Sequence, residues 1–361
     1  MLVRVRAYAF AVLDNLIQQL GALQSLSAAQ IATAVNALTT ESVSVESKAA
    51  FLAALAKKGE AAEEIAAFAT ELRARSIQPP LDAETRSREI LDVCGTGGDH
   101  LGTFNISTTV AIVCAAAGVT VAKHGNRAIT SKAGSADVLE ALGIRVDLSP
   151  AEAAARLRDH GFAFFFAPNY HPAFKHIAPA RKLCAERGER TIFNFLGPLL
   201  NPVHPTAQLL GVPKPELCEP LAQVLQSLGI RRGMVVSGIV QSPKSNAQGL
   251  DELSTLGVNT VAEFYQERGF TCSTLDPNQF PLQPATLADL IGGDREANAE
   301  IIRQILRGED RGPKRDAVLL NAGAALFVAG RARSIGAGWE LAAAVIDDGK
   351  AAAKLAQLQS R

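Results

Sequence analysis

Excess charge of either sign is missing from this 361-residue sequence, because 36 lysines and arginines balance 36 aspartates and glutamates. Nucleic-acid-binding proteins usually carry an excess of positive charge, so the balance argues against that class. Long hydrophobic runs are also missing. The longest, at 110–119 and 319–330, are shorter than the roughly 18–20 residues that span a bilayer. We therefore expect a soluble protein with neither nucleic acid nor a membrane as partner.

Cysteine is sparse as well. The five cysteines are scattered without a CxxC pair, which is unlike a disulfide framework and favours reduced thiols in a cytoplasmic protein. The six histidines show no HExxH spacing and no Cys/His cluster, so we expect no structural metal. Arg4 and Arg6 precede a short apolar stretch that reaches Asp14 without a small-residue cleavage site. We interpret this start as a first helix rather than a signal peptide.

The first part of the chain has only helical periodicity. Apolar residues recur at helical spacing through residues 1–88, and Ser27 with Gln30 predicts a capping box at a helix start. Pro79 and Pro80 precede a polar stretch, which indicates a linker. The composition, 48% hydrophobic and 20% charged, is that of a globular protein long enough for two domains. We expect the first to be helical.

From Glu89 onward, short apolar runs alternate with helical segments, which is typical of a parallel sheet built from βαβ units. Two further runs, 260–265 and 269–275, predict an antiparallel addition. Ser149, Pro150 and Glu152 predict a capped helix that ends at Gly161. The apolar runs lie at 89–94, 119–122, 144–148, 162–168, 207–212 and 233–238, and the last helices are expected at 295–306, 314–328 and 339–358.

The alternation is interrupted between His171 and Asn201. Residues 171–188 have a helical pattern, whereas 191–202 are too rich in glycine and proline for either a helix or a strand. We interpret this interruption as a return of the chain into the helical domain.

A glycine cluster, GTGGD at 95–99, lies between a predicted strand and the helix that begins at Asn105. Glycines let backbone N–H groups turn toward an anion, and a helix N-terminus adds a favourable dipole, so the loop suits a phosphate. A tight turn explains a glycine cluster equally well. The loop is neither the Walker pattern nor GxGxxG. Asn105 or Ser107 is expected as the N-cap, a role compatible with phosphate or magnesium binding.

The next predicted strand ends in KHGNR at 123–127, which carries two fixed cations and an imidazole. Ser131, Gly134 and Ser135 extend this loop into the following helix. Alone, such a segment is more often a solvated loop. Beside a phosphate loop at the same carboxyl edge of a sheet, it favours anion binding, because ligands bind at that edge in open α/β sheets.

Asp251 and Glu252 are adjacent carboxylates between an expected extended polar loop and the stretch LSTLG. Most such pairs are solvated acidic turns. Magnesium, however, is bound by one or two protein carboxylates together with water and substrate phosphates, so this pair also suits a metal beside the phosphate loops.

Seven motifs, taken in order, resemble those of the anthranilate phosphoribosyltransferase family, and the resemblance covers nearly the whole chain. They are GTGGD at 95–99, TFNIST at 103–108, KHGNR at 123–127, GSADVLEALG at 134–143, HPAFKH at 171–176, RTIFNFLGPLLNP at 190–202 and DEL at 251–253.

This resemblance implies transfer of the phosphoribosyl group of 5-phosphoribosyl 1-diphosphate (PRPP) to the amino group of anthranilate, with release of pyrophosphate, in tryptophan biosynthesis. It implies Mg²⁺ as cofactor and a homodimer formed through the helical domain. The implied fold class is α/β, like that of nucleoside phosphorylases and phosphoribosyltransferases, with a mostly parallel central sheet. A small discontinuous helical domain (1–88 and about 172–206) accompanies the larger α/β domain (89–171 and 207–361).

The resemblance also implies site residues. For PRPP these are Gly95, Gly98, Asp99, Thr103, Asn105, Ile106, Ser107, Thr108, Lys123, His124, Gly125, Asn126, Arg127, Ser131 and Ser135. For anthranilate they are Gly95, His124, Asn126, His171 and Arg181, and for Mg²⁺, directly or through water, they are Ser107, Asp251 and Glu252. No general base is implied, and Lys123 is expected to stabilise the transition state.

Two segments, 183–189 and 240–249, are longer than the family pattern, which bears on the placement of Arg181 and of the acidic pair. Two alternatives stand beside the family function. A pyrimidine nucleoside phosphorylase shares the architecture but uses orthophosphate, and the TFNIST and DEL motifs favour a magnesium-bound diphosphate instead. A catalytically silent relative that binds nucleic acid would need a basic stripe, which the balanced charge does not favour.

Overall fold

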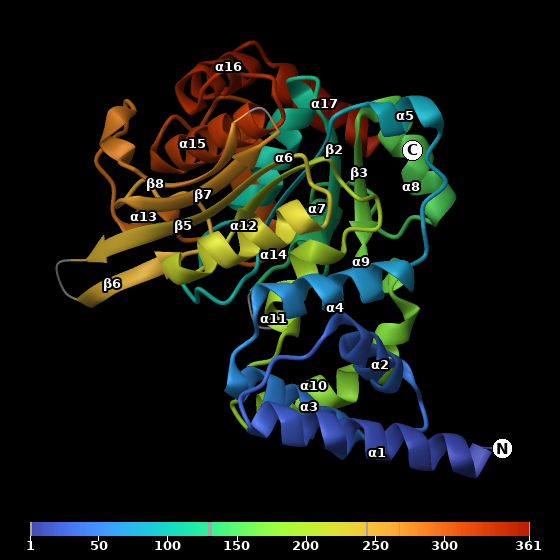
Figure 1. Cartoon of the computed structure of the whole chain (residues 1–361). Helices are drawn as coiled ribbons and strands as arrows, with labels where there is room; N and C mark the ends of the chain where they lie inside the picture. Colours follow the sequence, from blue (N-terminus) through green and yellow to red (C-terminus); the bar gives the residue numbers. More distant parts are fainter. Residues whose placement is uncertain (1, 129–131, 243–244, 267, 361) are drawn as a thin grey trace. The chain divides into compact units, whose positions relative to one another are not determined.

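The computed structural model describes residues 2–128, 132–242, 245–266 and 268–360 and divides the chain into two units (Figure 1). The helical unit consists of Met1–Ile77 and Tyr170–Leu200, and the α/β unit of Gln78–Asn169 and Asn201–Arg361. The chain thus has a helical domain and a larger α/β domain with a mostly parallel sheet, which is the fold class that the sequence predicts.

The boundaries differ from the predicted ones. The helical unit ends at Ile77 rather than at 88, because the short helix α5 (Ala83–Ser87) belongs to the α/β unit and buries Thr85 there completely. The return segment ends at Leu200 rather than near 206. Asn201 is fully buried and donates hydrogen bonds to strands of the α/β unit.

The helical unit contains one continuous set of helices and one set from the return segment. The capping box at Ser27 and Gln30 is confirmed. Residues 191–202, expected to form neither helix nor strand, contain two short helices, because Thr191 and Ile192 accept the backbone hydrogen bonds of the first turn. The elements are α1 (Leu2–Gly21), α2 (Ala28–Thr39), α3 (Val45–Lys58), α4 (Ala62–Ala74), η1 (Pro172–His176), α10 (Ala178–Glu186), α11 (Phe193–Leu196) and η2 (Gly197–Leu200), with α9 (Ala167–Tyr170) at the crossing between units.

The α/β unit is built on a sheet with the strand order β3-β2-β1-β4-β5-β7-β8, and β6 pairs with β5. The first five strands run parallel, and β7 and β8 add antiparallel pairs, as predicted. The carboxyl ends of β1, β2 and β4 therefore share one edge. The strands are β1 (Ile90–Gly95), β2 (Thr120–Gly125), β3 (Phe162–Phe166), β4 (Ala207–Gly211), β5 (Arg232–Ser242), β6 (Ser245–Leu250), β7 (Asn259–Tyr265) and β8 (Gly269–Leu275).

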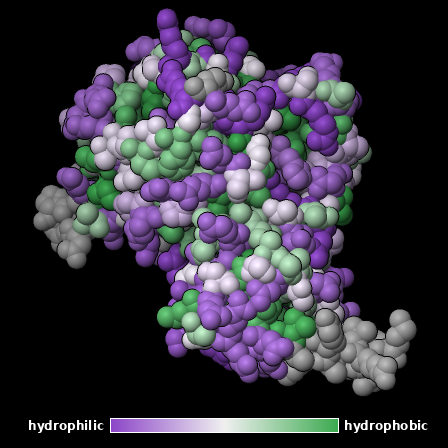
Figure 2. All heavy atoms as spheres, viewed as in Figure 1, coloured by the Kyte–Doolittle hydropathy of each residue, from purple (hydrophilic) through white to green (hydrophobic). Residues whose placement is uncertain are grey.

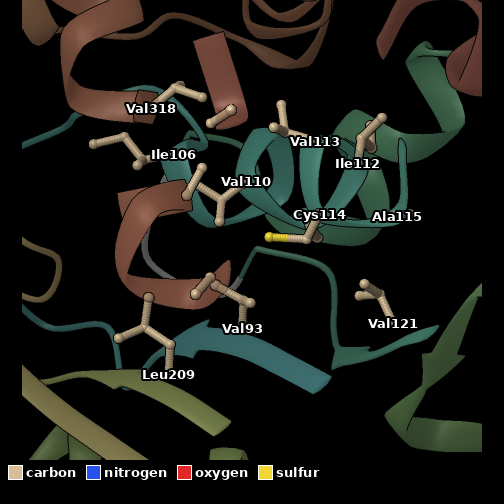
Figure 3. Packing of buried hydrophobic residues seen from close by; sticks show 14 of the residues in the cluster. Val93, Ile106, Val110, Ile112, Val113, Cys114, Ala115, Val121, Leu209 and Val318 are labelled. Carbon is tan, nitrogen blue, oxygen red and sulfur yellow. The ribbon is translucent and has the colours of Figure 1, made fainter. Parts of the chain in front are cut away.

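Helices cover both faces of this sheet. On one face, Leu91, Val93 and Leu209 join the main hydrophobic core with α6, and Figure 3 shows Val110 and Cys114 of α6 above Val93 and Leu209. On the other face, α8 packs on β2 and β3, and α12 packs on β5 and β7. The helices are α6 (Ile106–Ala116), α7 (Ser135–Ala141), α8 (Pro150–His160), α12 (Cys218–Ser227), α13 (Leu287–Leu290), α14 (Arg295–Leu306), α15 (Pro313–Val328), α16 (Ile335–Asp347) and α17 (Lys350–Gln359), with the short turns η3 (Pro215–Leu217) and η4 (Pro277–Gln279).

Three predicted elements differ in the structure. The run 144–148 buries Ile144, Val146 and Leu148 but is not a strand; β3 already occupies the free side of β2. The helix expected over 339–358 is two helices, since Gly349 adopts a φ of +73° between them. The polar stretch before Asp251 forms the β5–β6 pairing instead of a loop.

The visible surface mixes polar and apolar residues. Figure 2 shows hydrophilic and hydrophobic residues interspersed over the visible face. Nowhere in the described ranges does a helix combine the length and the apolar character that crossing a bilayer requires.

Candidate functional site

A cavity of about 570 Å³ lies in the α/β unit at the carboxyl ends of β1 and β2. The glycine loop, the start of α6, the KHGNR segment and the acidic pair all line it, so the stretches that the sequence predicts to meet do lie together. Ser131 falls outside the described residues. The predicted residues that line the cavity are Gly95, Gly98, Asp99, Thr103, Asn105, Ile106, Ser107, Thr108, Lys123, His124, Gly125, Asn126, Arg127, Ser135, Asp251 and Glu252.

The glycine loop fits closely against the acidic pair. Gly97 and Gly98 have φ values of +76° and +86°, which favour glycine. The Gly97 N–H donates a 2.7 Å hydrogen bond to Asp251 Oδ2. At Gly95, a Cβ atom would overlap the carboxylate of Asp251. Because glycine has no Cβ atom, position 95 leaves room for the Asp251 side chain.

The N-terminus of α6 is joined to the same acidic pair. Asn105 is the N-cap, but its side chain accepts a hydrogen bond from Asn298 rather than capping the helix. The Ser107 N–H donates to Glu252 Oε1 at 3.2 Å, so a carboxylate of the protein already satisfies one of the first free N–H groups. The Thr108 hydroxyl is buried without a hydrogen-bond partner in the described part of the chain.

Lys123 is almost completely buried beside these groups. Its Nζ donates to the Val93 carbonyl at 2.6 Å and to Ser107 Oγ at 3.3 Å. Burial lowers the pKa of the ammonium, while the nearby charges of Asp92 and Glu252 act in the opposite direction. The site thus holds a cation whose direct partners are neutral, which leaves it able to attract an anionic ligand.

The carboxylates around Lys123 crowd one another. Burial and the neighbouring charges of Asp99 and Glu252 raise the pKa of Asp251 well above its ordinary value. Burial also raises the pKa of Glu252 to about 7, with Lys123 opposing the shift. Raised pKa values for these adjacent, buried carboxylates indicate that nearby positive charge and hydrogen bonds do not fully balance their negative charge.

A divalent cation fits this donor set, because it would relieve the repulsion between Asp251, Glu252 and Asp99. In the described residues, no group of three or more His, Cys, Asp or Glu side chains is arranged to hold a metal alone. Mg²⁺ bound here would therefore take further oxygen ligands from water, a hydroxyl such as that of Ser107, or a phosphate.

The KHGNR segment is positioned by tight backbone contacts. A Cβ atom at Gly134 would overlap the backbone around Arg127 and Asn126. The Arg127 guanidinium, expected to contact PRPP, pairs instead with Glu140 at 2.6 and 2.7 Å and with Asp137 at 3.2 Å. Arg127 lines the cavity, but these carboxylates neutralise its charge, so it is a poor anion ligand in this arrangement.

The helical unit holds the two remaining predicted residues, His171 and Arg181. The rings of His171 and Phe174 stack at 5.1 Å, Phe174 meets Phe193 edge-on at 5.6 Å, and the Arg181 guanidinium lies over Phe193 at 4.9 Å. Burial lowers the pKa of His171 to about 4 and also lowers that of Arg181. Arg181 lies within α10, and the longer 183–189 segment follows it at the end of this helix.

Several residues of these clusters were not predicted. Phe174 and Phe193 lie inside the HPAFKH and RTIFNFLGPLLNP motifs, so the motifs contained a signal for them. Asn298, which bonds to Asn105 and to the Gly293 N–H, lies far along the chain in α14. Nothing in its local sequence pattern indicates this contact.

Comparisons with known proteins agree with the architecture. The model for the "Glycosyl transferase family, a/b domain" matches residues 87–352, and that for the "Glycosyl transferase family, helical bundle domain" matches residues 14–76. The anthranilate phosphoribosyltransferase of Lacticaseibacillus casei is 50% identical over 310 residues, 86% of each protein.

Solved structures are similar over almost the full length. The anthranilate phosphoribosyltransferase of Thermus thermophilus has a TM-score of 0.85 at 41% identity, covering 95% of this chain and 98% of that one. The enzyme of Saccharomyces cerevisiae in complex with PRPP and Mg has a TM-score of 0.83 at 27% identity, covering 96% and 97%.

Proposed function

Because this chain belongs to the anthranilate phosphoribosyltransferase family, we propose that it transfers the phosphoribosyl group of PRPP to the amino nitrogen of anthranilate and releases pyrophosphate. The proposed reaction is a step of tryptophan biosynthesis. The observation that carries the proposal is that the glycine loop, Lys123 and the acidic pair line a single cavity. A diphosphate needs backbone N–H donors, a cation and a metal site within reach of one another.

The diphosphate of PRPP is proposed to lie between the glycine loop and Lys123. The hydrogen-bond partners of the buried Lys123 ammonium are neutral, so they balance its positive charge only in part. The Thr108 hydroxyl, which has no partner among the described residues, offers a further donor. As the bond from C1 to the diphosphate breaks, negative charge accumulates on the departing oxygens. Fixed donors in a poorly hydrated site stabilise that charge strongly.

Ser107, Asp251 and Glu252 are proposed to hold Mg²⁺, directly or through water, with Asp99 adjacent. The raised pKa values of Asp251 and Glu252 support this assignment, since they indicate negative charge that is undercompensated. A magnesium ion bound there would neutralise charge on the diphosphate. The Gly97–Asp251 and Ser107–Glu252 hydrogen bonds hold the two carboxylates that would bind the metal.

The proposed anthranilate contacts rest on the family resemblance: Gly95, His124 and Asn126 belong to the α/β unit, and His171 and Arg181 to the helical unit. A guanidinium stacked on Phe193 keeps its N–H edge available for two charge-assisted hydrogen bonds to a carboxylate. An aryl amine is neutral and nucleophilic at pH 7. The reaction therefore needs no strong base, and the residues serve mainly to orient the two substrates.

We further propose a homodimer formed through the helical unit and a cytoplasmic location, both on the family resemblance. The five free cysteines suit a reducing compartment. Sedimentation equilibrium of the full chain tests the dimer: a monomer at micromolar concentration contradicts it.

The activity is tested by mixing the protein with Mg²⁺, PRPP and anthranilate and following the decay of anthranilate fluorescence together with pyrophosphate release. Equal rates support the proposal. Excess EDTA should abolish both signals, and Asp251→Asn should raise the Mg²⁺ concentration needed for half-maximal rate. Phosphorolysis of a pyrimidine nucleoside without PRPP turnover would contradict the proposed reaction.

A further inference from the structure

The two strands that carry the phosphate loops separate before they reach the cavity. β1 pairs with β4 up to Gly95, and β2 pairs with β3 up to Gly125. Between β1 and β2, however, the pairing ends at Leu91 and Val121, although both strands lie entirely within the described residues. The gap opens toward the edge where the glycine loop and KHGNR line the cavity.

Side-chain hydrogen bonds connect β1 and β2 where their backbone pairing is missing. The Asn201 amide donates to Asp92 Oδ2 at 2.9 Å and to the Ala122 carbonyl at 2.8 Å. Asp92 Oδ1 accepts the N–H of His124 at 3.4 Å. Ala122 and His124 flank Lys123, so one Asp–Asn pair holds the peptide groups on both sides of this lysine. Lys123 itself reaches across to the Val93 carbonyl of β1.

We propose that Asp92 and Asn201 are positioning residues that hold β1 and β2 apart at the carboxyl edge and so set the distance between the glycine loop and Lys123. The inference rests on the proposed function, because that distance matters only if both groups hold the same diphosphate. Neither residue is proposed to contact substrate, and neither lines the cavity.

The energetic cost of this arrangement supports a role beyond folding. Asp92 and Asn201 are both 0% exposed, and burial raises the pKa of Asp92 to about 6. Continued β1–β2 pairing with apolar side chains would satisfy the backbone without burying a carboxylate, and replacing buried charged groups by apolar ones is often neutral or stabilising. The pair thus maintains a separation that ordinary sheet pairing would remove.

Asn201 also lies at a particular point of the chain. It is the first residue of the α/β unit after the return segment of the helical unit, and its Oδ1 accepts the Val203 N–H at 3.0 Å. The residue that sets the strand separation therefore also anchors the segment through which the chain re-enters this unit.

Exchanging the two side chains tests the inference. Asp92→Asn places an amide donor against either the Asn201 amide or the His124 N–H, and Asn201→Asp brings two carboxylates together. In the double variant the bond between positions 92 and 201 can form again with position 92 as donor, whereas the Ala122 carbonyl loses its donor and faces a carboxylate oxygen. We expect each single variant to raise the KM for PRPP at least about tenfold with the KM for anthranilate changed less than about twofold, and the double variant to recover to about threefold above wild type.

Asp347→Asn is the matched control, because it breaks a partly buried pair with Arg315 (2.8 and 2.9 Å) that does not line the cavity. It should lower the thermal stability and leave the KM for PRPP unchanged. If the position-92 and position-201 variants behave like this control, the inference is overturned. Should one single variant fail to fold, an unchanged KM for PRPP in the other single variant has the same meaning.

Calorimetric binding of pyrophosphate with Mg²⁺ separates this inference from the proposed function. Weaker binding in the single variants, with partial recovery in the double variant, supports the positioning role even if wild type fails to use anthranilate. Unchanged pyrophosphate binding in a catalytically active protein would overturn the positioning role alone.

Discussion

The Gly97 N–H donates a hydrogen bond of 2.7 Å to Oδ2 of Asp251, which joins the glycine loop to a carboxylate far along the sequence. A second bond, from Ser107 to Glu252, joins the start of α6 to the neighbouring carboxylate. The acidic pair is therefore tied to both the glycine loop and the start of α6. Changes on either side of these contacts should affect the proposed diphosphate and metal sites together.

Gly95→Ala should lower kcat/KM at least about 100-fold, since a displacement of catalytic groups by about 1 Å has an effect of this order. The added Cβ would overlap the Asp251 carboxylate and its backbone oxygen. Steady-state kinetics over a range of Mg²⁺ concentrations measures the effect. Gly336→Ala is the control, because the nearest atom to its Cβ would be 3.9 Å away. Comparable losses in both variants would contradict the close fit at Gly95.

Much of this site can be predicted from the sequence because the direction of the strands brings its parts together. Strands that alternate with helices run parallel, and their carboxyl ends meet at one edge. GTGGD and KHGNR each begin at the carboxyl end of such a strand, and β1 and β2 are neighbours, so the two motifs lie close together. The same reasoning predicts the βαβ core and the antiparallel addition of β7 and β8.

Contacts that depend on how the helices and strands pack together could not be predicted from the sequence. Arg127 carries the charge expected of an anion ligand, but its pairing with Glu140 depends on where α7 lies. The apolar pattern of 144–148 suits a strand, yet β3 takes the pairing position. The separation of β1 from β2 depends on Asn201, which adjoins the helical unit in sequence, and no local pattern indicates its bond to Asp92.

Phe193→Leu should raise the KM for anthranilate by about 2- to 30-fold, the range expected for loss of a cation–π contact worth about 0.5–2 kcal/mol. The ring lies 4.9 Å from the Arg181 guanidinium and also contacts Phe174 edge-on. Phe193→Tyr retains an aromatic face and should remain closer to wild type. The KM for PRPP provides the internal reference, and equal increases for both substrates would remove Phe193 and Arg181 from the proposed acceptor site.

Arg181→Ala should raise the KM for anthranilate further than Phe193→Leu does, because it removes the proposed carboxylate donor itself. Arg181→Lys keeps the charge but loses the planar fork and the stacking, so we expect it to resemble Ala more than wild type. Measuring both substrates at saturating concentrations of the other distinguishes acceptor binding from general damage. A lysine variant with wild-type KM would contradict the bidentate contact.

Asn321→Ala should loosen the acidic pair without touching it. The fully buried Asn321 of α15 accepts the Leu253 N–H and donates to the Leu253 carbonyl, both at 2.9 Å. Loss of these bonds should lower the free energy of unfolding by about 1–3 kcal/mol and raise the Mg²⁺ concentration needed for half-maximal rate. Asp347→Asn again serves as the control, because it should lower stability with an unchanged Mg²⁺ requirement.

His171→Gln should make the stability of the protein less sensitive to acid. Burial lowers the pKa of His171 to about 4, below the value near 6.5 of an unfolded histidine. Between about pH 6.5 and 4, the unfolded state therefore binds a proton that the folded state excludes, and stability falls as the pH falls. The wild type should lose on the order of 3 kcal/mol more over this window than the variant. Denaturant unfolding at several pH values measures the difference, and NMR titration of the ring protons checks its cause. A variant with the wild-type pH dependence would show that His171 already titrates normally in the folded protein, with its ring accessible to solvent protons rather than held neutral beside Phe174.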